Sequence, residues 1–520
     1  MSHSGSLASS TLRNAVSLFA GAGLSRILGF VRDILFAYIL GAGWVADIFL
    51  AAFRLPHFAR RLLQEGTLSL SFIPAFKKAQ TGGNENAFIF ARTVGVELFL
   101  FNIAFVLLCV FGAGLIAKVF LPGFASTPSL IELASRLLSI SLFYLPLAAG
   151  AAVAGGVLMA LGHYKIPAAS PVALNTGLLI SAALVLLYGY SGYFAARVLC
   201  WGLLGGGLLQ FLLHIAALKR YKFSFKGPLK LNDPNNIRFV KSLPFSMLGS
   251  AAYQVNVLIA MLIASFLPEG SISALYYAER LIELPMALVG VSLGTASMAA
   301  FATLAIEERR TELSIELKRI LGMVFFLTVP AAFGLVAFAL PLIQSIFWRG
   351  AFDVQAIALT STALFFYAPA LPAVAASRIL LSALNARGNT LPTVAAAIAS
   401  LLCMVVFAFL LMPSLQLAGV ALAASIAAWI NFALLLLAMK RSNLYDCTVG
   451  FFPHKKFIFY TAISIVMATV MAMCNLLALH YNLSNGIRLA VGIPLACAVY
   501  FGLAALLKSP ELKQLRGLKK

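Results

Sequence analysis

The most constraining feature of this sequence is a pair of apolar segments, 15–39 and 43–64, that carry charged residues in their interiors. Each segment is long enough to cross a bilayer as a helix, which takes about 20 apolar residues. A charge at the bilayer centre costs about 2.5–3.5 kcal/mol on insertion scales, so such residues persist where they face a wet cavity or a partner. The charged residues in or beside the two segments are Arg26, Arg32, Asp33, Asp47, Arg54, Arg60, Arg61 and Glu65. We therefore expect this region to form the wall of a polar cavity inside a membrane protein.

The composition fits a polytopic membrane protein and no other class. Of the 520 residues, 62% are hydrophobic and 11% are charged, whereas a soluble domain carries about 25% charged residues. The net charge of +21 could indicate a nucleic-acid partner. The basic residues are spread over alternate loops rather than gathered in one domain, so we expect no nucleic acid. The six cysteines show no CxxC spacing, and they indicate neither a disulfide framework nor a metal site.

An enzyme is disfavoured by the small number of acids. Membrane enzymes acting on prenyl phosphates usually need clustered carboxylates for metal binding or acid–base chemistry. Only 17 acids are present, and the densest interior group of them is paired with arginines. We therefore expect a transporter without a cofactor.

Fourteen apolar segments are predicted to span the membrane. Loops with several Lys and Arg residues, above all 219–241, alternate with loops such as PGFASTPS, PEGSIS and MPSLQLAG that have none. Basic loops remain on the cytoplasmic side, so an even number of spans is expected, with both termini cytoplasmic. The predicted spans are 15–39, 43–64, 88–118, 131–160, 168–190, 194–218, 243–267, 272–302, 317–346, 356–384, 391–412, 416–439, 457–479 and 486–507.

Short internal repeats indicate a duplicated unit. AFRLP from Ala52 resembles AERLI from Ala278, and AALKR ending at Arg220 resembles LAMKR ending at Arg441. Offsets of 226 and 221 residues suggest two six-helix lobes, 1–222 and 223–445, in parallel orientation around a central cavity. Residues 446–520 then supply two extra helices and a basic tail. The expected fold is thus an all-α polytopic membrane protein with 14 transmembrane helices.

Helical spacing places several of the charges on shared faces. Seven positions return a side chain to nearly the same face of a helix, which groups Arg26 with Asp33, and Asp47 with Arg54 and Arg61. A further arginine, Arg280, has acids one position before it and three after it, Glu279 and Glu283. An arginine fork matches a pair of phosphate oxygens. Several arginines around one cavity would suit a diphosphate.

Structural explanations for the same residues remain open. Arg60 and Arg61 can extend to the cytoplasmic interface, and Arg26 and Arg32 can pair with Asp33 only to fix helix packing. Arg280 can be interfacial. The polar residues Asn175, Gln254, Asn256 and Asn431 are expected to form interhelical hydrogen bonds.

Three stretches resemble a known family: SRILGFVRD (Ser25–Asp33), the segment Gly41–Phe76, and YYAERLIELPMALVGVSLGT (Tyr276–Thr295). They are similar to the signature regions of the MurJ (MviN) lipid II flippases, within the multidrug/oligosaccharidyl-lipid/polysaccharide exporter superfamily. The resemblance implies a V-shaped pair of six-helix lobes and a groove for the polyprenyl tail made by the last two helices. It also implies movement of lipid II, an undecaprenyl-diphosphate-linked peptidoglycan precursor, to the outer leaflet of the bacterial cytoplasmic membrane.

The resemblance also assigns residues. The family's functional arginines fall on Arg26, Arg32, Arg60 and Arg280, and Arg54 stands where many members have Lys or Arg. Its acids fall on Asp33, Asp47 and Glu65, and Glu279 stands where some members have Asp. Some members have a cation site with acids in the seventh and eleventh helices. The corresponding segments, 243–267 and 391–412, contain no Asp or Glu, so that site is not expected.

Two other functions remain open from the sequence. One is export of another polyprenyl-linked oligosaccharide or of a drug by a member of the same superfamily. The other is a non-transporting membrane scaffold, against which the retained intramembrane charges argue. If the chain is a lipid II flippase, its expected partners are lipid II and membrane lipid.

Overall fold

The computed structural model describes residues 23–64, 71–221, 223–231, 233, 235–241, 255, 258–385, 391–442, 445–446 and 448–517. Every regular element in these ranges is a helix, as the sequence predicts for an all-α protein. Within the described part of the chain, ten helical segments are long and apolar enough to cross a membrane. The chain forms two compact units, the first made of Met1–Ile272 with Arg349–Phe352 and the second of Ser273–Trp348 with Asp353–Lys520.

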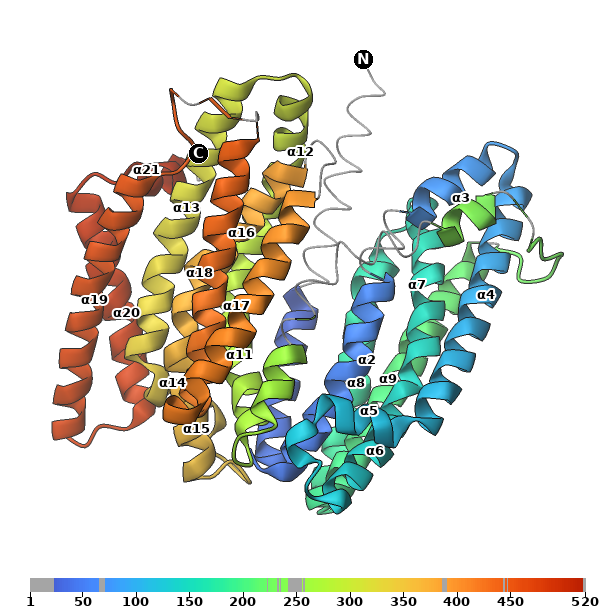
Figure 1. The fold of residues 1–520 in the computed structure, drawn as a ribbon, viewed down its shortest axis with the longest axis horizontal. Coiled ribbons are helices and arrows are strands. Elements are labelled where there is room, and N and C mark those ends of the chain that lie inside the picture. Colours follow the sequence, from blue (N-terminus) through green and yellow to red (C-terminus); the bar gives the residue numbers. More distant parts are fainter. Residues whose placement is uncertain are drawn as a thin grey trace. The chain divides into compact units, whose positions relative to one another are not determined.

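The first unit is built on long helices that lie side by side (Figure 1). Within it, α8 packs along α9, α7 packs against both α4 and α9, and α2 packs against α6 and α7. A helix over residues 23–40 precedes them. The labelled helices are α2 (Trp44–Gln64), α3 (Ile73–Gln80), α4 (Asn84–Phe111), α5 (Ala113–Phe120), η2 (Pro122–Phe124), α6 (Pro128–Leu142), α7 (Tyr144–Ala160), α8 (Lys165–Leu187) and α9 (Gly192–Arg220).

The second unit has its core around α13 (Figure 1). This helix packs against α16 and α19, while α17 pairs with α18 and α19 pairs with α20. Its helices are α11 (Ser271–Met286), η3 (Ala287–Val291), α12 (Ser292–Ile306), α13 (Arg310–Ala337), α14 (Ala339–Phe347), α15 (Val354–Tyr367), η4 (Ala368–Ala370), α16 (Leu371–Leu384), α17 (Leu391–Leu415), α18 (Leu417–Arg441), α19 (His454–His480), α20 (Asn485–Leu506) and α21 (Pro510–Gly517).

Prolines divide three of the predicted spans into shorter helices. A proline cannot donate the hydrogen bond to the carbonyl four residues earlier, and its ring crowds that carbonyl. Pro146 lies four residues after Leu142, where α6 ends, and Pro341 lies four residues after Ala337, where α13 ends. Pro372 likewise follows Ala368, the start of η4, by four residues. Each predicted span is present as a helical segment, but with a break at its proline.

The outer surface of the long helices is apolar. On α4, Leu108 and Phe111 are 70% and 94% exposed, and the helix has only one acid in its first turn and no base in its last. A soluble protein rarely exposes a continuous surface of this kind. The exposed side chains therefore face lipid, as expected for a multi-pass membrane protein.

The short C-terminal helix α21 is attached to α19 by polar contacts. The carboxylate of Glu511, on α21, is 1% exposed and accepts hydrogen bonds from Lys456 Nζ at 2.6 Å and from the Tyr460 hydroxyl. Gly322 of α13 makes room for it, because a Cβ there would lie 2.7 Å from Glu511 Oε1. In the adjoining segment 442–453, hydrogen bonds from Thr311 and Thr448 lower the pKa of Asp446 to about 2.

Some predictions fall on residues that the structure does not describe. These are most of the predicted span 243–267, the first eight residues of the span 15–39, Glu65, Gln254 and Asn256. The count of 14 helices and the lobes 1–222 and 223–445, with the additional segment 446–520, stay predictions.

Candidate functional site

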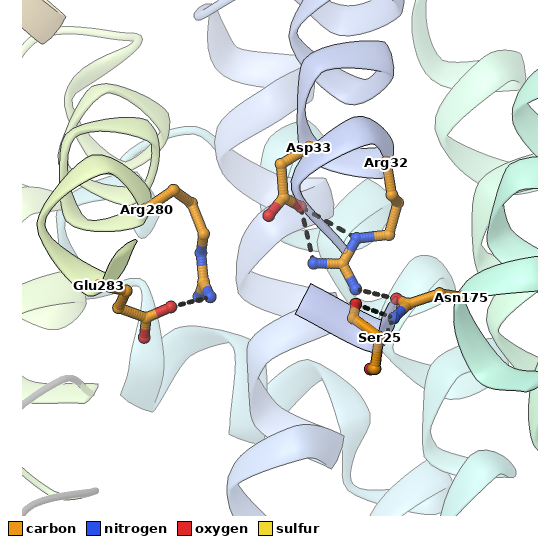
Figure 2. A network of polar contacts seen from close by, with 6 residues as sticks. All are labelled: Ser25, Arg32, Asp33, Asn175, Arg280 and Glu283. Carbon is orange, nitrogen blue, oxygen red and sulfur yellow. Dashed lines mark hydrogen bonds and ion pairs between the residues drawn. The ribbon is translucent and has the colours of Figure 1, made fainter. Parts of the chain in front are cut away.

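A buried polar network of the first unit surrounds Arg32, on the helix 23–40 (Figure 2). Its Nε and Nη2 donate to Asp33 Oδ1 at 2.9 and 2.7 Å, and its Nη1 donates to Asn175 Oδ1 at 2.9 Å. The Asn175 amide in turn donates to the backbone carbonyl of Ser25 at 3.0 Å. A side chain of α8 thus joins two turns of the first helix and fixes the plane of the guanidinium.

Aromatic rings complete the surroundings of this arginine. The guanidinium carbon of Arg32 lies 5.6 Å from the ring centre of Phe36 and 5.2 Å from that of Phe53. Arg32 is 8% exposed and Asp33 is 1% exposed. In such an environment a cation is stabilised by the ring faces, and the adjacent carboxylate offsets its charge. Arg32 is therefore a buried cation held in one orientation.

Arg26 and Asp33 were predicted to share a helix face, but Asp33 forms its ion pair with Arg32 instead. Arg32 and Asp33 are neighbours in the sequence, and Arg32 Nη2 lies 2.7 Å from Asp33 Oδ1. Arg26 is exposed, and no described residue forms an ion pair with it. The long arginine side chain can reach the carboxylate of the next residue, although the two residues point to different faces of the helix.

The charged residues of α2 lie on its buried side. Asp47 is 1% exposed and Arg54 is 9% exposed, as their predicted common face requires. Asp47 Oδ2 accepts a hydrogen bond from the backbone N–H of Gly270 at 2.8 Å. Arg60 and Arg61 are partly buried. This helix and the helix 23–40 together carry five arginines and two acids, so their described side chains have a net positive charge.

In the second unit, the predicted charge group of α11 is present. Arg280 Nη1 donates to Glu283 Oε2 at 2.5 Å (Figure 2), and its guanidinium carbon lies 4.6 Å from the ring centre of Tyr276. The side chains of Arg280 and Glu283 are 21% and 27% exposed, whereas Glu279 is 8% exposed. Of the two flanking acids that the sequence offered, Glu283, three positions after Arg280, forms this ion pair.

Sequence reasoning did not assign Asn175 to the site. It predicted an interhelical hydrogen bond for this residue, and that prediction is confirmed, but the partner is Arg32. A polar residue in an apolar span was the available signal; the partner is 143 positions away and no spacing rule connects the two. Among the described residues, no group of three or more His, Cys, Asp or Glu could hold a metal ion.

Lipid-facing helices and buried arginines paired with acids and an amide define a multi-pass α-helical membrane protein of the transporter type. The family model for the lipid II flippase MurJ matches residues 36–493. A probable lipid II flippase MurJ of Bdellovibrio bacteriovorus is 32% identical over 514 residues, covering 97% of this chain and 96% of that protein. A second, from Rhizobium meliloti, is 33% identical over 424 residues and covers 80% of this chain and 77% of its own length. The chain belongs to the lipid II flippase MurJ family.

Solved structures agree with this assignment. A structure described as lipid II flippase MurJ in an inward closed conformation has a TM-score of 0.79 and 25% identity, with 95% of this chain and 99% of that chain covered. An inward-facing multidrug transporter of the MATE family has a TM-score of 0.67 and 14% identity, with 80% of this chain and 94% of that chain covered. The similarity to the MATE transporter supports the fold only.

Proposed function

We propose that this chain flips lipid II from the inner to the outer leaflet of the bacterial cytoplasmic membrane. Family membership supports the activity, and the observation that supports the site is the buried network of Arg32, Asp33 and Asn175. Charged residues inside membrane segments are rare and commonly mark the path of a substrate. The diphosphate of lipid II would be the ligand of this cation.

The chemistry proposed for Arg32 is an exchange of partners. Two of its nitrogens donate to a single oxygen of Asp33, and two nitrogens in one plane are also what a pair of phosphate oxygens requires. A diphosphate would replace the carboxylate, while Asn175 keeps the guanidinium in place. Asp33 would take the arginine back after release, so the empty carrier never holds an uncompensated buried cation.

The other proposed ligands of the diphosphate are Arg26, Arg54, Arg60 and Arg280. Arginine is suited to this task because it stays charged and binds in a fork. Glu283 would release Arg280 as Asp33 releases Arg32. Proposed charge partners or gating residues are Asp33, Asp47, Glu65, Glu279 and Glu283, and the proposed set includes no metal ligand.

The proposed architecture has 14 helices, with lobes 1–222 and 223–445 that alternate in access to a cavity. The helices of 446–520 would hold the polyprenyl tail in lipid. The alternation of basic and neutral loops supports two cytoplasmic termini. The sugars and peptide of the substrate would occupy water-filled space, so only the diphosphate needs charged ligands.

The test is depletion of the protein in its bacterial host, followed by an assay of lipid II accessibility at the outer leaflet. We expect lipid II to accumulate and its outer-leaflet exposure to fall before the cells lyse. If a different polyprenyl-linked oligosaccharide accumulates while lipid II exposure is unchanged, the chain exports that substrate. If no lipid-linked intermediate accumulates, the chain is a scaffold and the proposal is wrong.

A further inference from the structure

The second unit contains a small, mainly apolar cavity with a few polar side chains in its wall. It has a volume of about 260 Å³ and lies where α13, α14, α15 and α19 meet. Seven of its ten lining residues are apolar, and the three polar ones are Ser361, Thr362 and Asn475. No lining residue is charged. The cavity is separate from the arginine networks described above, since neither Arg280 nor Glu283 lines it.

Two of the three polar side chains of the cavity, Asn475 and Thr362, form no hydrogen bond with the described residues. Asn475 Oδ1 is buried without a partner, and the Asn475 amide donates to no described residue. Thr362 forms no hydrogen bond to the described part of the chain, while the Ser361 hydroxyl donates to the Ala358 carbonyl at 3.2 Å and keeps its lone pairs available. Leaving a buried amide oxygen unsatisfied costs about 1–3 kcal/mol. The walls therefore offer both donors and acceptors to an occupant.

The depth of the cavity matches the boundary between headgroups and hydrocarbon. Helix α19 has 27 residues, so it is about 40 Å long at 1.5 Å per residue, longer than the bilayer's hydrocarbon core of about 30 Å. Asn475 lies five residues before the helix end at His480, about 7.5 Å from it. Each headgroup layer is about 5–7 Å thick. With α19 spanning both headgroup layers, Asn475 therefore lies near the inner edge of one of them, within reach of a lipid headgroup that turns sideways into the cavity.

The surroundings of the cavity indicate how an occupant enters. Two of the lining side chains, Leu340 and Phe365, are 48% and 46% exposed on the lipid-facing surface. On α19 the neighbouring Met473 and Leu476 are 59% and 65% exposed. An amphiphile could lay its chain along these apolar side chains and place its polar end in the cavity. A volume of about 260 Å³ exceeds that of one water, about 30 Å³, but is too small for a whole lipid.

We propose that this cavity binds the glycerol headgroup of phosphatidylglycerol from the adjacent leaflet. Hydroxyl groups both donate and accept, which matches the amide of Asn475 and the hydroxyls of Thr362 and Ser361. The lack of charged lining residues selects a neutral headgroup end and disfavours an ammonium or a phosphate inside the cavity. The phosphate of the lipid remains at the mouth, in the interfacial layer.

The test is native mass spectrometry of the full purified chain with three lipids of identical acyl chains. Phosphatidylglycerol is the probe, phosphatidic acid carries a phosphate without the glycerol headgroup, and phosphatidylethanolamine carries an ammonium. The variant combines Asn475→Leu with Thr362→Val, which preserve volume and remove the polar atoms. The matched control is Thr469→Val on the same helix, because the Thr469 hydroxyl is exposed and donates within the helix to Ile465 at 2.9 Å.

We expect the wild-type protein to retain phosphatidylglycerol in preference to the other two lipids. The double variant should bind it about tenfold more weakly, the effect of losing two ordinary hydrogen bonds, and Thr469→Val should bind it normally. Thermal unfolding of each variant checks that the fold is kept. Equal retention of the three lipids by the wild type, or an unchanged preference in the double variant, would overturn the proposal and leave the cavity to water.

Discussion

Individual residues show why the site contains arginine. Three nitrogens of Arg32 donate hydrogen bonds to two partners, Asp33 on its own helix and Asn175 on α8. A lysine ammonium cannot reproduce that planar set of donors. The pairing also explains how a membrane helix tolerates the charge, because Asp33 neutralises it and Phe53 covers it. The hydrogen bonds also fix the plane of the guanidinium, which the proposed exchange of the Asp33 carboxylate for phosphate oxygens requires.

The first prediction concerns the arginines themselves. Arg26→Ala, Arg32→Ala and Arg280→Ala should each abolish complementation of a depleted host while the protein still inserts, because each removes a proposed ligand of the diphosphate. Arg32→Lys should also fail, since a point charge does not replace a fork. The measurements are colony formation and immunoblots of membrane fractions. Normal growth of all three alanine variants would contradict the proposed role.

The second prediction concerns Asn175, which acts through Arg32. Asn175→Leu should lower lipid II exposure about tenfold, because a hydrogen bond to a charged group contributes about 1.5–3 kcal/mol. Raising substrate should partly restore transport, as expected if only the orientation of Arg32 is lost. The control is Asn102→Leu, since the Asn102 amide donates only within its own helix, to Leu98 at 2.7 Å. A loss of the same size in both variants would indicate a packing defect instead.

The site could be predicted from sequence only where the signal was local. The charges of Arg32 and Asp33 in an apolar span, and the spacing of Arg280 and Glu283, were visible in the chain. The Asn175 contact was not, because its partner depends on how α8 packs against the first helix. The Gly270 contact with Asp47 uses a backbone N–H, a group that every non-proline residue has and no sequence pattern marks.

At the scale of helices, hydrophobic length predicted where the segments lie but not how they break. The apolar runs of the segments 131–160 and 317–346 are continuous, so a length criterion treats each as one span. Pro146 and Pro341 interrupt the backbone hydrogen bonds at Leu142 and Ala337. Proline position alone would not have predicted these breaks, because α8, α13 and α20 continue through Pro171, Pro330 and Pro494.

The third prediction concerns the attachment of α21. Glu511→Gln should lower the melting temperature of the purified protein, because Lys456 loses the carboxylate that it contacts at 2.6 Å. Gly322→Val should do the same, since its Cβ would lie 2.7 Å from Glu511 Oε1. We expect a cost of about 1–3 kcal/mol, below that of a fully buried pair because Lys456 is 33% exposed.

The control for α21 is an ion pair on the same unit. Glu316→Gln removes the partner of Arg319 on α13, whose side chain is 53% exposed, and exposed pairs contribute about 0–1 kcal/mol. Thermal unfolding in detergent measures both changes. If Glu316→Gln and Glu511→Gln shift the melting temperature equally, the buried carboxylate does not attach α21.

At the scale of the whole molecule, the distribution of basic loops predicts orientation. The loop 219–241 should be cytoplasmic, because its seven basic residues oppose translocation. Single cysteines placed there, in a background without native cysteines, should resist a membrane-impermeant thiol reagent in intact cells. A cysteine at Glu269, which is exposed in the segment Pro268–Ser273, should react. The reverse labelling pattern would invert the topology and the direction of transport.

The predicted orientation of the protein in the membrane determines how the membrane potential acts on transport. A diphosphate carries about two negative charges, and a bacterial cytoplasm is electrically negative, so outward movement of the headgroup is favoured by the potential. One charge crossing is worth about 2.3 kcal/mol per 100 mV, and two uncompensated charges give about twice that. Arginines that move through the field with the headgroup reduce this gain, and the voltage-sensitive step then becomes the return of the empty carrier.

The last prediction is that membrane potential, and not a sodium gradient, supports the cycle. The segments 243–267 and 391–412 contain no Asp or Glu, so the carboxylates that a coupling cation would need are missing from both. Lipid II exposure at the outer leaflet should therefore stop when an ionophore collapses the potential and continue when sodium is replaced by choline. Exposure that survives loss of the potential but stops without sodium would mean that other oxygen ligands bind a coupling cation.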